Sequence, residues 1–203
     1  MNEVVTLDAT MVPEVVDVIH ESFFDYPVMR FVLGDTGGEY ASRLRALVTF
    51  FVMARVFRDE VMLGVPGDGG LIGTAVVSRP GGPDPDPGFY ELRDRLWAEL
   101  GPEARDRYSA FGSACAPFQP DEPHLHLNMI GVRRSWQGRG ISRLLIEQVH
   151  ELSRHDPDSA GVSLTTENPR NVSLYRHYGY DLVGEAAVAP GLTTWGFYRR
   201  DDA

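Results

Sequence analysis

Hydrophobic positions in the first part of the chain recur at the spacing of amphipathic helices. In residues 8–24, apolar side chains lie three or four positions apart, which places them on one face of a helix. Residues 39–57 repeat this pattern with leucine, valine and phenylalanine. The stretch between them, 25–38, holds a proline and three glycines, so we predict a loop there with no more than a short turn of helix.

The rest of the chain alternates between runs typical of strands and stripes typical of helices. We predict strands at residues 3–7, 60–65, 70–79, 121–132, 161–167, 180–188 and 193–200. We predict further helices at about residues 88–100, 103–114, 141–152 and 170–178. Residues 79–90 hold four prolines and three glycines, which predicts an exposed irregular connection. Strands mixed with helices, some in β-α-β order, predict an α/β or α+β fold with a largely central sheet.

Composition excludes several classes of protein. A chain of 203 residues corresponds to one domain of ordinary size, or to one domain with an insertion. Its net charge of −10 argues against nucleic acid as the main partner. The start lacks the basic and apolar regions of a signal peptide, and the longest apolar run, 46–56, is too short to span a bilayer. We therefore expect a cytoplasmic chain with no membrane partner. The single cysteine, Cys115, has no metal-ligand spacing around it, which predicts neither a disulfide nor a metal site.

Four arginines and two glycines gather where a predicted strand gives way to a helix. The stretch 131–152 reads GVRRSWQGRGISRLLIEQVHEL and places Gly138 and Gly140 at the start of a helix with one apolar stripe. Unpaired N–H groups and the helix dipole favour anions there, which predicts a phosphorylated ligand. The spacing matches neither a P-loop nor a dinucleotide fingerprint. On spacing alone, the glycines equally suit a simple turn and the arginines a solvated face.

Two stretches in this region resemble the signatures of a known enzyme family. The sequence VRRSWQGRGISRLL resembles the acetyl-CoA-binding motif Q/R-x-x-G-x-G/A of the GNAT N-acetyltransferases, although Ser135 replaces its Gln or Arg. Downstream, ENPRNVSLYRHYGY resembles the second signature of that family, in the expected order and with a strand between the two. FFDYPVMR, EPHLHLNMIGV and TTWGFYR are similar to the subgroup that includes puromycin N-acetyltransferase.

The resemblance implies the architecture and the donor. Residues 1–203 would form a single GNAT domain, with an irregular and helical insertion at about 79–118. Its sheet would be mixed and mostly antiparallel, of about six to seven strands, with helices on both faces. The cofactor would be acetyl-CoA, with its pyrophosphate at the glycine turn and its pantetheine arm paired like a strand. The implied contacts are Ile130, Gly131, Val132, Gln137, Gly138, Arg139, Gly140, Ile141, Ser142, Arg143, Asn168, Asn171 and Tyr175.

The resemblance also implies an acid for the acyl transfer. Tyr175 matches the tyrosine of the family, and its hydroxyl would protonate the departing thiolate. The alternative is a core tyrosine. For the base, period-two alternation places His126 and Asn128 on one polar strand face, which makes His126 a candidate proton acceptor. Glu122 and Glu167 are alternatives, as is proton loss to bulk water.

The acceptor is the least defined part of the sequence-based account. Asp25, Tyr26 and Arg30 lie in a region that borders the acceptor pocket in the family, and we also assign Asn128 to substrate binding. We expect acetyl transfer to a primary amine of a small molecule, such as an antibiotic-like compound. A protein N-terminus or lysine is the alternative acceptor, and a non-catalytic acyl-CoA-binding module is the alternative of another class. The chain would act as a monomer or a homodimer.

Overall fold

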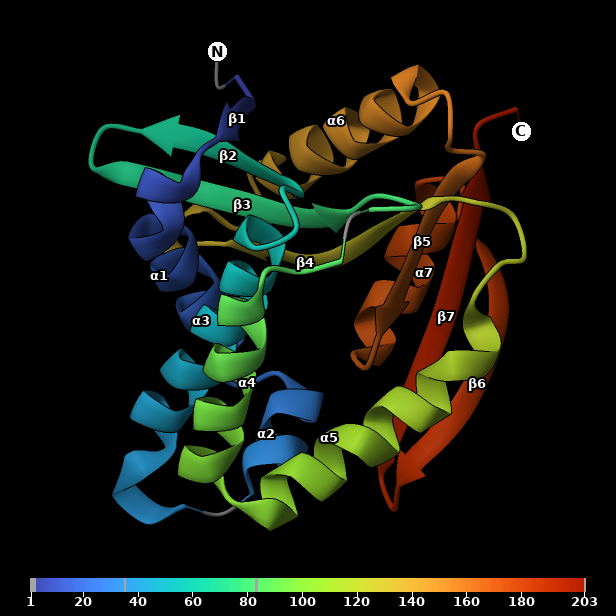
Figure 1. Cartoon of the computed structure of the whole chain (residues 1–203). Helices are drawn as coiled ribbons and strands as arrows, with labels where there is room; N and C mark the ends of the chain where they lie inside the picture. The colour runs from blue at the N-terminus through green and yellow to red at the C-terminus, as the bar shows by residue number, and fades with distance from the viewer. Residues whose placement is uncertain (1–2, 35, 83, 203) are drawn as a thin grey trace.

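Seven strands form one sheet in the computed structural model, which describes residues 3–34, 36–82 and 84–202 (Figure 1). The strands are β1 (Val5–Leu7), β2 (Val61–Gly67), β3 (Gly70–Ser78), β4 (Leu125–Val132), β5 (Gly161–Thr166), β6 (Asp181–Ala189) and β7 (Leu192–Arg200). Their order across the sheet is β1-β2-β3-β4-β5-β7-β6, and the only parallel pair is β4 with β5. The predicted mixed, mostly antiparallel sheet is therefore confirmed.

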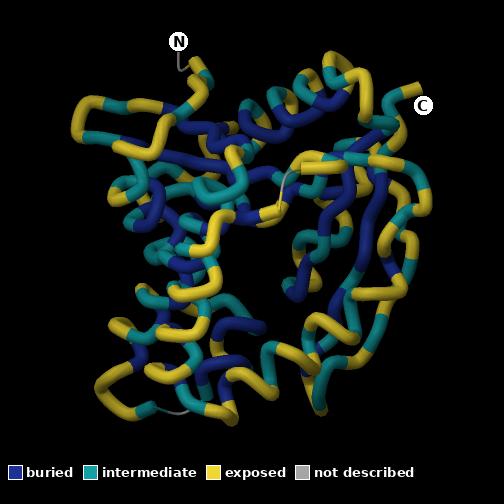
Figure 2. The backbone as a smooth tube through the Cα atoms, viewed as in Figure 1, coloured by how far each residue is buried: buried dark blue, intermediate teal, exposed yellow. Residues whose placement is uncertain are grey.

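Helices cover both faces of this sheet. In the described residues they are α1 (Val12–Ser22), α2 (Pro27–Leu33), α3 (Tyr40–Val56), α4 (Pro87–Leu100), α5 (Pro102–Cys115), α6 (Ile141–His155) and α7 (Pro169–His177). One core lies between the sheet and the helices α1 to α5, and a second lies beneath α6 and α7. In β3, Val76 belongs to the first core, whereas its neighbours Ala75 and Val77 belong to the second, because successive strand residues point to opposite faces. Figure 2 shows the buried strands between these layers.

The structure corrects two element predictions. Residues 27–33 form the helix α2, which is longer than the short turn predicted for the loop at 25–38. Pro27 stands at the first helical position, where its missing N–H costs nothing, so it starts a helix here rather than breaking one. Similarly, the stretch predicted to be irregular over 79–90 ends at Asp86, because α4 begins at Pro87, one residue before the helix predicted at about 88–100. Asp86 caps that helix by accepting a hydrogen bond from the N–H of Gly88 at 2.8 Å.

The strands β4 and β5 separate soon after they meet. They pair only at Leu125 with Val162 and at His126 with Ser163. From there to its end, β4 pairs with β3 alone, so its other edge has no strand partner. Asn128 is an extra residue between two paired positions, a β-bulge, at the point where the strands diverge. This separation opens the middle of the sheet and positions the candidate site.

Candidate active site

A cavity of about 760 Å³ lies where β4 and β5 separate. Residues of β4, the start of α6, the end of β5 and α7 line one part of it. Residues of the helices α1 to α5 line the other part. Two chemically different walls therefore face each other across one space, as expected of a site that joins a donor and an acceptor.

The turn before α6 forms an open end of this cavity with free backbone donors. Gly138 and Gly140 have φ angles of 74° and 80°, a conformation that favours glycine, and no atom lies within 4 Å of where a Cβ would stand. No side chain caps α6, and none of the described residues accepts a hydrogen bond from the N–H groups of residues 141–143. Gly138 and Ser142 line the cavity. Open backbone and free donors at a helix start fit an anionic group such as a pyrophosphate.

Two of the four arginines hold this turn against α1. Arg133 pairs with Glu21 at 3.0 Å, from its Nη1 to Oε2. Arg134 donates its backbone N–H to Glu21 at 2.7 Å and pairs through its side chain with Asp25 at 3.0 Å. Acidic residues of the first helical region therefore neutralise these two arginines, and their role is to position the turn.

The other two arginines lie on the exposed side of the turn. The guanidinium of Arg139 stacks on the Trp136 ring, 4.9 Å from its centroid. Arg143 pairs with Glu147 one helical turn later, at 2.7 Å. Neither side chain lines the cavity, whereas Gln137, Gly138, Ile141 and Ser142 do. Contact of Arg139 and Arg143 with phosphates stays a prediction.

The unpaired edge of β4 leads from the turn toward the centre of the cavity. Ile130 and Val132 line it, and the carbonyl of Val132 accepts a hydrogen bond from Gln137 Nε2 at 3.2 Å. Gly131 packs against α1, where a Cβ would collide with Ser22. An amide-bearing ligand can pair with such an edge as an extra strand.

Asn168 and Asn171 reach the cavity from the start of α7. Asn168 caps this helix, because its Oδ1 accepts a hydrogen bond from the N–H of Arg170 at 3.1 Å and Pro169 follows it. Asn171 Nδ2 donates to Thr166 Oγ1 at 3.1 Å. Both asparagines line the cavity, so the capping role and a ligand contact are compatible.

A buried carboxylate stands at the junction of the two walls. Glu167 directly follows β5, is 5% exposed and lines the cavity. The hydroxyl of Thr194 donates a hydrogen bond to Glu167 Oε1 at 2.8 Å. The backbone N–H of Glu167 donates a hydrogen bond to the Tyr26 hydroxyl at 3.1 Å. Burial raises the pKa of the Glu167 carboxyl to about 7, although the Thr194 hydrogen bond lowers it. A carboxyl that titrates near neutral pH is suited to accept a proton during turnover.

Tyr175 lies buried beside this carboxylate. Its ring packs against Tyr180 and Phe197, with centroids 5.8 and 5.7 Å away, and it lines the cavity. Burial first, and then the charge of Glu167, raises the pKa of the Tyr175 hydroxyl well above its usual range. The hydroxyl therefore keeps its proton at neutral pH and is available as a donor.

His126 also faces the cavity, but its electrostatics do not favour a base. Its Nδ1 lies 2.8 Å from the hydroxyl oxygen of Ser163. Burial, together with the charges of His124 and Arg55, lowers the pKa of His126 to about 4. The imidazole is therefore neutral at pH 7 and a weak proton acceptor.

The other residues assigned from sequence divide between the cavity and the surface. Tyr26 and Asn128 line the cavity, whereas Asp25 and Arg30 do not. Asp25 pairs with Arg30 at 2.7 Å, outside the lining. Glu122 binds Arg200 at 2.7 Å near a separate, smaller pocket.

Sequence reasoning ranked Glu167 only as an alternative, and it missed Thr194. The signal for Glu167 was a lone carboxylate at the end of a predicted strand, at the first position of the segment that resembles the second family signature. Thr194 gave no signal, because β7 meets Glu167 only in the folded sheet.

The described residues carry no group of three or more His, Cys, Asp or Glu side chains placed to hold a metal ion. None of the described helices is both long enough and apolar enough to cross a bilayer.

Comparisons with known proteins agree with this geometry. The model of the acetyltransferase (GNAT) family matches residues 52–180. A histone acetyltransferase HPA2 and related acetyltransferase from Corynebacterium glutamicum is similar with a TM-score of 0.69 and 21% identity, over 98% of this chain and 96% of that chain. A polyamine N acetyltransferase from Drosophila melanogaster is similar with a TM-score of 0.65 and 16% identity, over 98% of this chain and 100% of that chain. NAA60 from Arabidopsis thaliana, solved in complex with acetyl-CoA, is similar with a TM-score of 0.56 and 14% identity, over 98% of this chain and 99% of that chain.

Proposed function

Because the chain belongs to the GNAT acetyltransferase family and is therefore an acyltransferase, we propose that it moves an acetyl group from acetyl-CoA directly to a primary amine of a small molecule. One observation carries this proposal: the open turn before α6 leads into the same cavity as the buried Glu167 and the protonated Tyr175. The resemblance of several segments to the puromycin N-acetyltransferase subgroup supports a small-molecule acceptor. The half-buried thiol of Cys115 suits a cytoplasmic enzyme, acting as a monomer or homodimer.

The residues present fit the pyrophosphate and the pantetheine arm of the donor. The free N–H groups at the start of α6 would hold the pyrophosphate, and Gly138 and Gly140 leave room for it. The unpaired edge of β4 at Ile130 and Val132 offers groups that match the amides of the pantetheine arm. When bound, acetyl-CoA supplies the activated thioester.

Two side chains move the protons of the transfer. Glu167 accepts a proton from the acceptor amine, because its carboxyl is ionised at and above about pH 7 and faces the cavity. Tyr175 would give its hydroxyl proton to the departing sulfur as the carbon–sulfur bond breaks, since its raised pKa keeps the hydroxyl protonated until then. His126 stays neutral and helps to hold the wall through Ser163. We expect direct transfer, because Cys115, the single cysteine of the chain, is not among the residues that line the cavity.

The test is a calorimetric titration of the full chain with acetyl-CoA, using ATP and NAD as controls. The Gly138→Glu variant places bulk and negative charge in the cradle, at a φ angle that side chains avoid. It should weaken acetyl-CoA binding about a hundredfold, because charge-assisted hydrogen bonds contribute about 1.5–3 kcal/mol each.

The matched control is Gly112→Glu, at an exposed position of α5 with open space around it. This variant should bind acetyl-CoA like the unaltered chain. Absence of acetyl-CoA binding in the unaltered chain, or equal binding in the Gly138→Glu variant, would contradict the proposed site. A screen of primary amines by thiol release then tests the transfer itself.

A further inference from the structure

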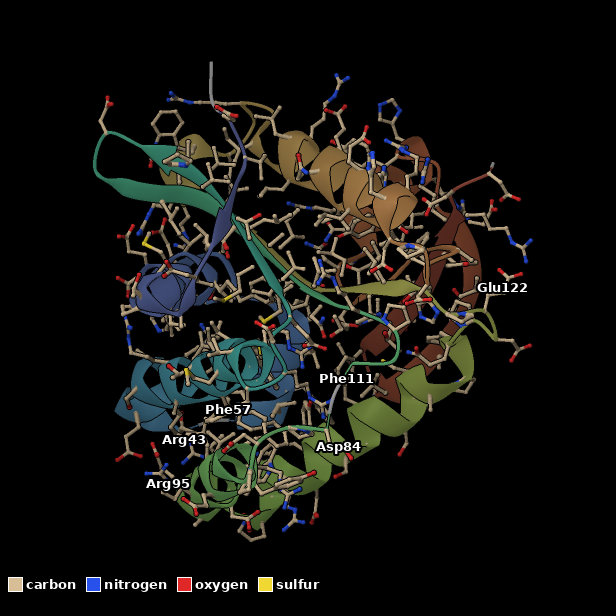
Figure 3. The ribbon with its side chains drawn as sticks, turned by 45° about the horizontal axis from the view of Figure 1, so that its top comes forward. Arg43, Phe57, Asp84, Arg95, Phe111 and Glu122 are labelled. Atoms are coloured by element: carbon tan, nitrogen blue, oxygen red, sulfur yellow. The ribbon has the colours of Figure 1, made fainter. Side chains whose placement is uncertain are left out.

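The acceptor part of the cavity has a wall of aromatic rings. Besides the buried Phe50 of α3, five partly buried rings line it from three helices: Phe51 of α3, Phe89 and Trp97 of α4, and Tyr108 and Phe111 of α5. Tyr108 packs between Phe51 and Trp97, with centroids 5.7 and 5.3 Å away. Figure 3 labels Phe111 on the side of α5 that faces the sheet. All five side chains are only partly buried in the chain alone, so they still have surface to offer a ligand.

Most of this wall comes from the segment between β3 and β4. The helices α4 and α5 carry four of the five rings, yet they bury few side chains of their own: Leu96, Leu100 and Ala104. Their outward faces are exposed, and their inward faces carry the aromatic side chains. The segment therefore supplies more aromatic side chains to the cavity wall than buried side chains to the core.

Two of the three arginines along the wall already have carboxylate partners. Arg55 Nε lies 2.8 Å from Glu60 Oε2. Arg93 Nη2 lies 2.9 Å from Asp94 Oδ1. In each pair the carboxylate compensates the charge of the arginine. Neither carboxylate is therefore available to bind the ammonium of a ligand at the aromatic wall.

The remaining charges are one cation and one carboxylate. Arg58 forms no ion pair with any carboxylate in residues 3–34, 36–82 or 84–202, and its guanidinium lies 5.5 Å from the centroid of the Phe89 ring. Glu167 is the only carboxylate among the cavity-lining residues that the structure describes. The cavity therefore offers one anionic group for one ammonium, and a second ammonium would be repelled by the guanidinium of Arg58, which lines the same cavity.

On the premise of the proposed function, we infer that the acceptor is an amine with a single positive charge and an aromatic ring, which packs against the rings of α3, α4 and α5. The ring of the acceptor gains offset and edge-to-face contacts with the wall. Its amine reaches Glu167, where the proton is lost before the nitrogen forms its bond to the acetyl carbon and the sulfur leaves. Linear polyamines carry more than one positive charge, and neither they nor peptides without aromatic side chains match the aromatic surface.

The test compares four acceptors at saturating acetyl-CoA, by thiol release and by product mass. They are 2-phenylethylamine, n-hexylamine, spermidine and a short peptide with a free N-terminus. We expect kcat/KM for 2-phenylethylamine to exceed that for n-hexylamine by about tenfold or more, because several aromatic contacts add to ring burial. Spermidine and the peptide should be slower still.

Two variants test whether the preference for 2-phenylethylamine over n-hexylamine comes from the aromatic wall. Tyr108→Leu should remove most of the tenfold preference for 2-phenylethylamine and change n-hexylamine little. Tyr90→Leu is the matched control, because Tyr90 is 43% exposed on α4 and does not line the cavity. Unaltered acetyl-CoA affinity in both variants confirms that they fold.

The outcomes separate two failures. If no amine releases thiol although acetyl-CoA binds, the proposed function itself is wrong, and this inference falls with it. If spermidine, the peptide or n-hexylamine reacts at least as efficiently as 2-phenylethylamine, the inference is overturned and the proposed function stands. A preference that survives Tyr108→Leu would also overturn it.

Discussion

The buried carboxyl of Glu167 makes stability depend on pH in a way that a single substitution can isolate. Burial raises the pKa of this group from 4.5 to about 7 in the folded chain. The Glu167→Gln variant keeps an oxygen that can accept the Thr194 hydrogen bond, and it removes the titrating group. The cost of burying the charge should therefore disappear in the variant.

The magnitude follows from the difference between the two pKa values. Between pH 4.5 and about 7, the unfolded chain has lost the Glu167 proton while the folded chain still holds it. Because the folded state binds more protons, the free energy of unfolding falls as pH rises through this window. A change from 4.5 to about 7 corresponds to about 3 kcal/mol, at about 1.4 kcal/mol per pH unit. The stability lost in the unaltered chain between pH 4 and pH 8 should therefore exceed that lost in Glu167→Gln by about 3 kcal/mol.

Urea unfolding of both proteins at intervals from pH 4 to pH 8, without ligands, measures this difference. Groups common to both chains, including His126, cancel in the comparison. Glu99→Gln, at an exposed position of α4, is the control and should follow the unaltered chain at every pH. A difference between Glu167→Gln and the unaltered chain that stays constant across the range would refute the reasoning, because it would mean that Glu167 titrates alike in the folded and unfolded states.

Two further predictions concern turnover. Tyr175→Phe should retain acetyl-CoA affinity by calorimetry and lower kcat about a hundredfold, as the loss of a proton donor does; an unchanged kcat would remove Tyr175 from the mechanism. Thr194→Val removes a hydrogen bond that lowers the pKa of Glu167, so that pKa should rise above about 7. The acidic limb of the kcat/KM profile should then move to higher pH, and a limb that stays in place would argue against Glu167 as the base.

Much of the fold could be predicted because its signals are local. The apolar stripe of α6 and the alternation of β4 are visible within single segments, and the structure contains both elements. The helix α2 escaped prediction because Pro27 and the following glycines suggest a loop unless the buried contacts of Val28 and Val32 are known.

The candidate site could be predicted only in part, for the same physical reason. The glycine turn before α6 is a local motif, so its glycines could be identified from sequence. The choice between Glu167 and His126 depends on burial and on partners such as Thr194, which come from distant parts of the chain. Likewise, the aromatic wall combines rings from three helices and has no local signature.

The most direct test of the account is to incubate the full chain with acetyl-CoA and the amine panel, and to follow the masses of both amine and protein. Direct transfer predicts that one amine gains a single acetyl group, that thiol is released in equal amount, and that the protein mass does not change. Thiol release without an N-acetylated product, or accumulation of acetylated protein, would contradict direct transfer to an amine in this cavity.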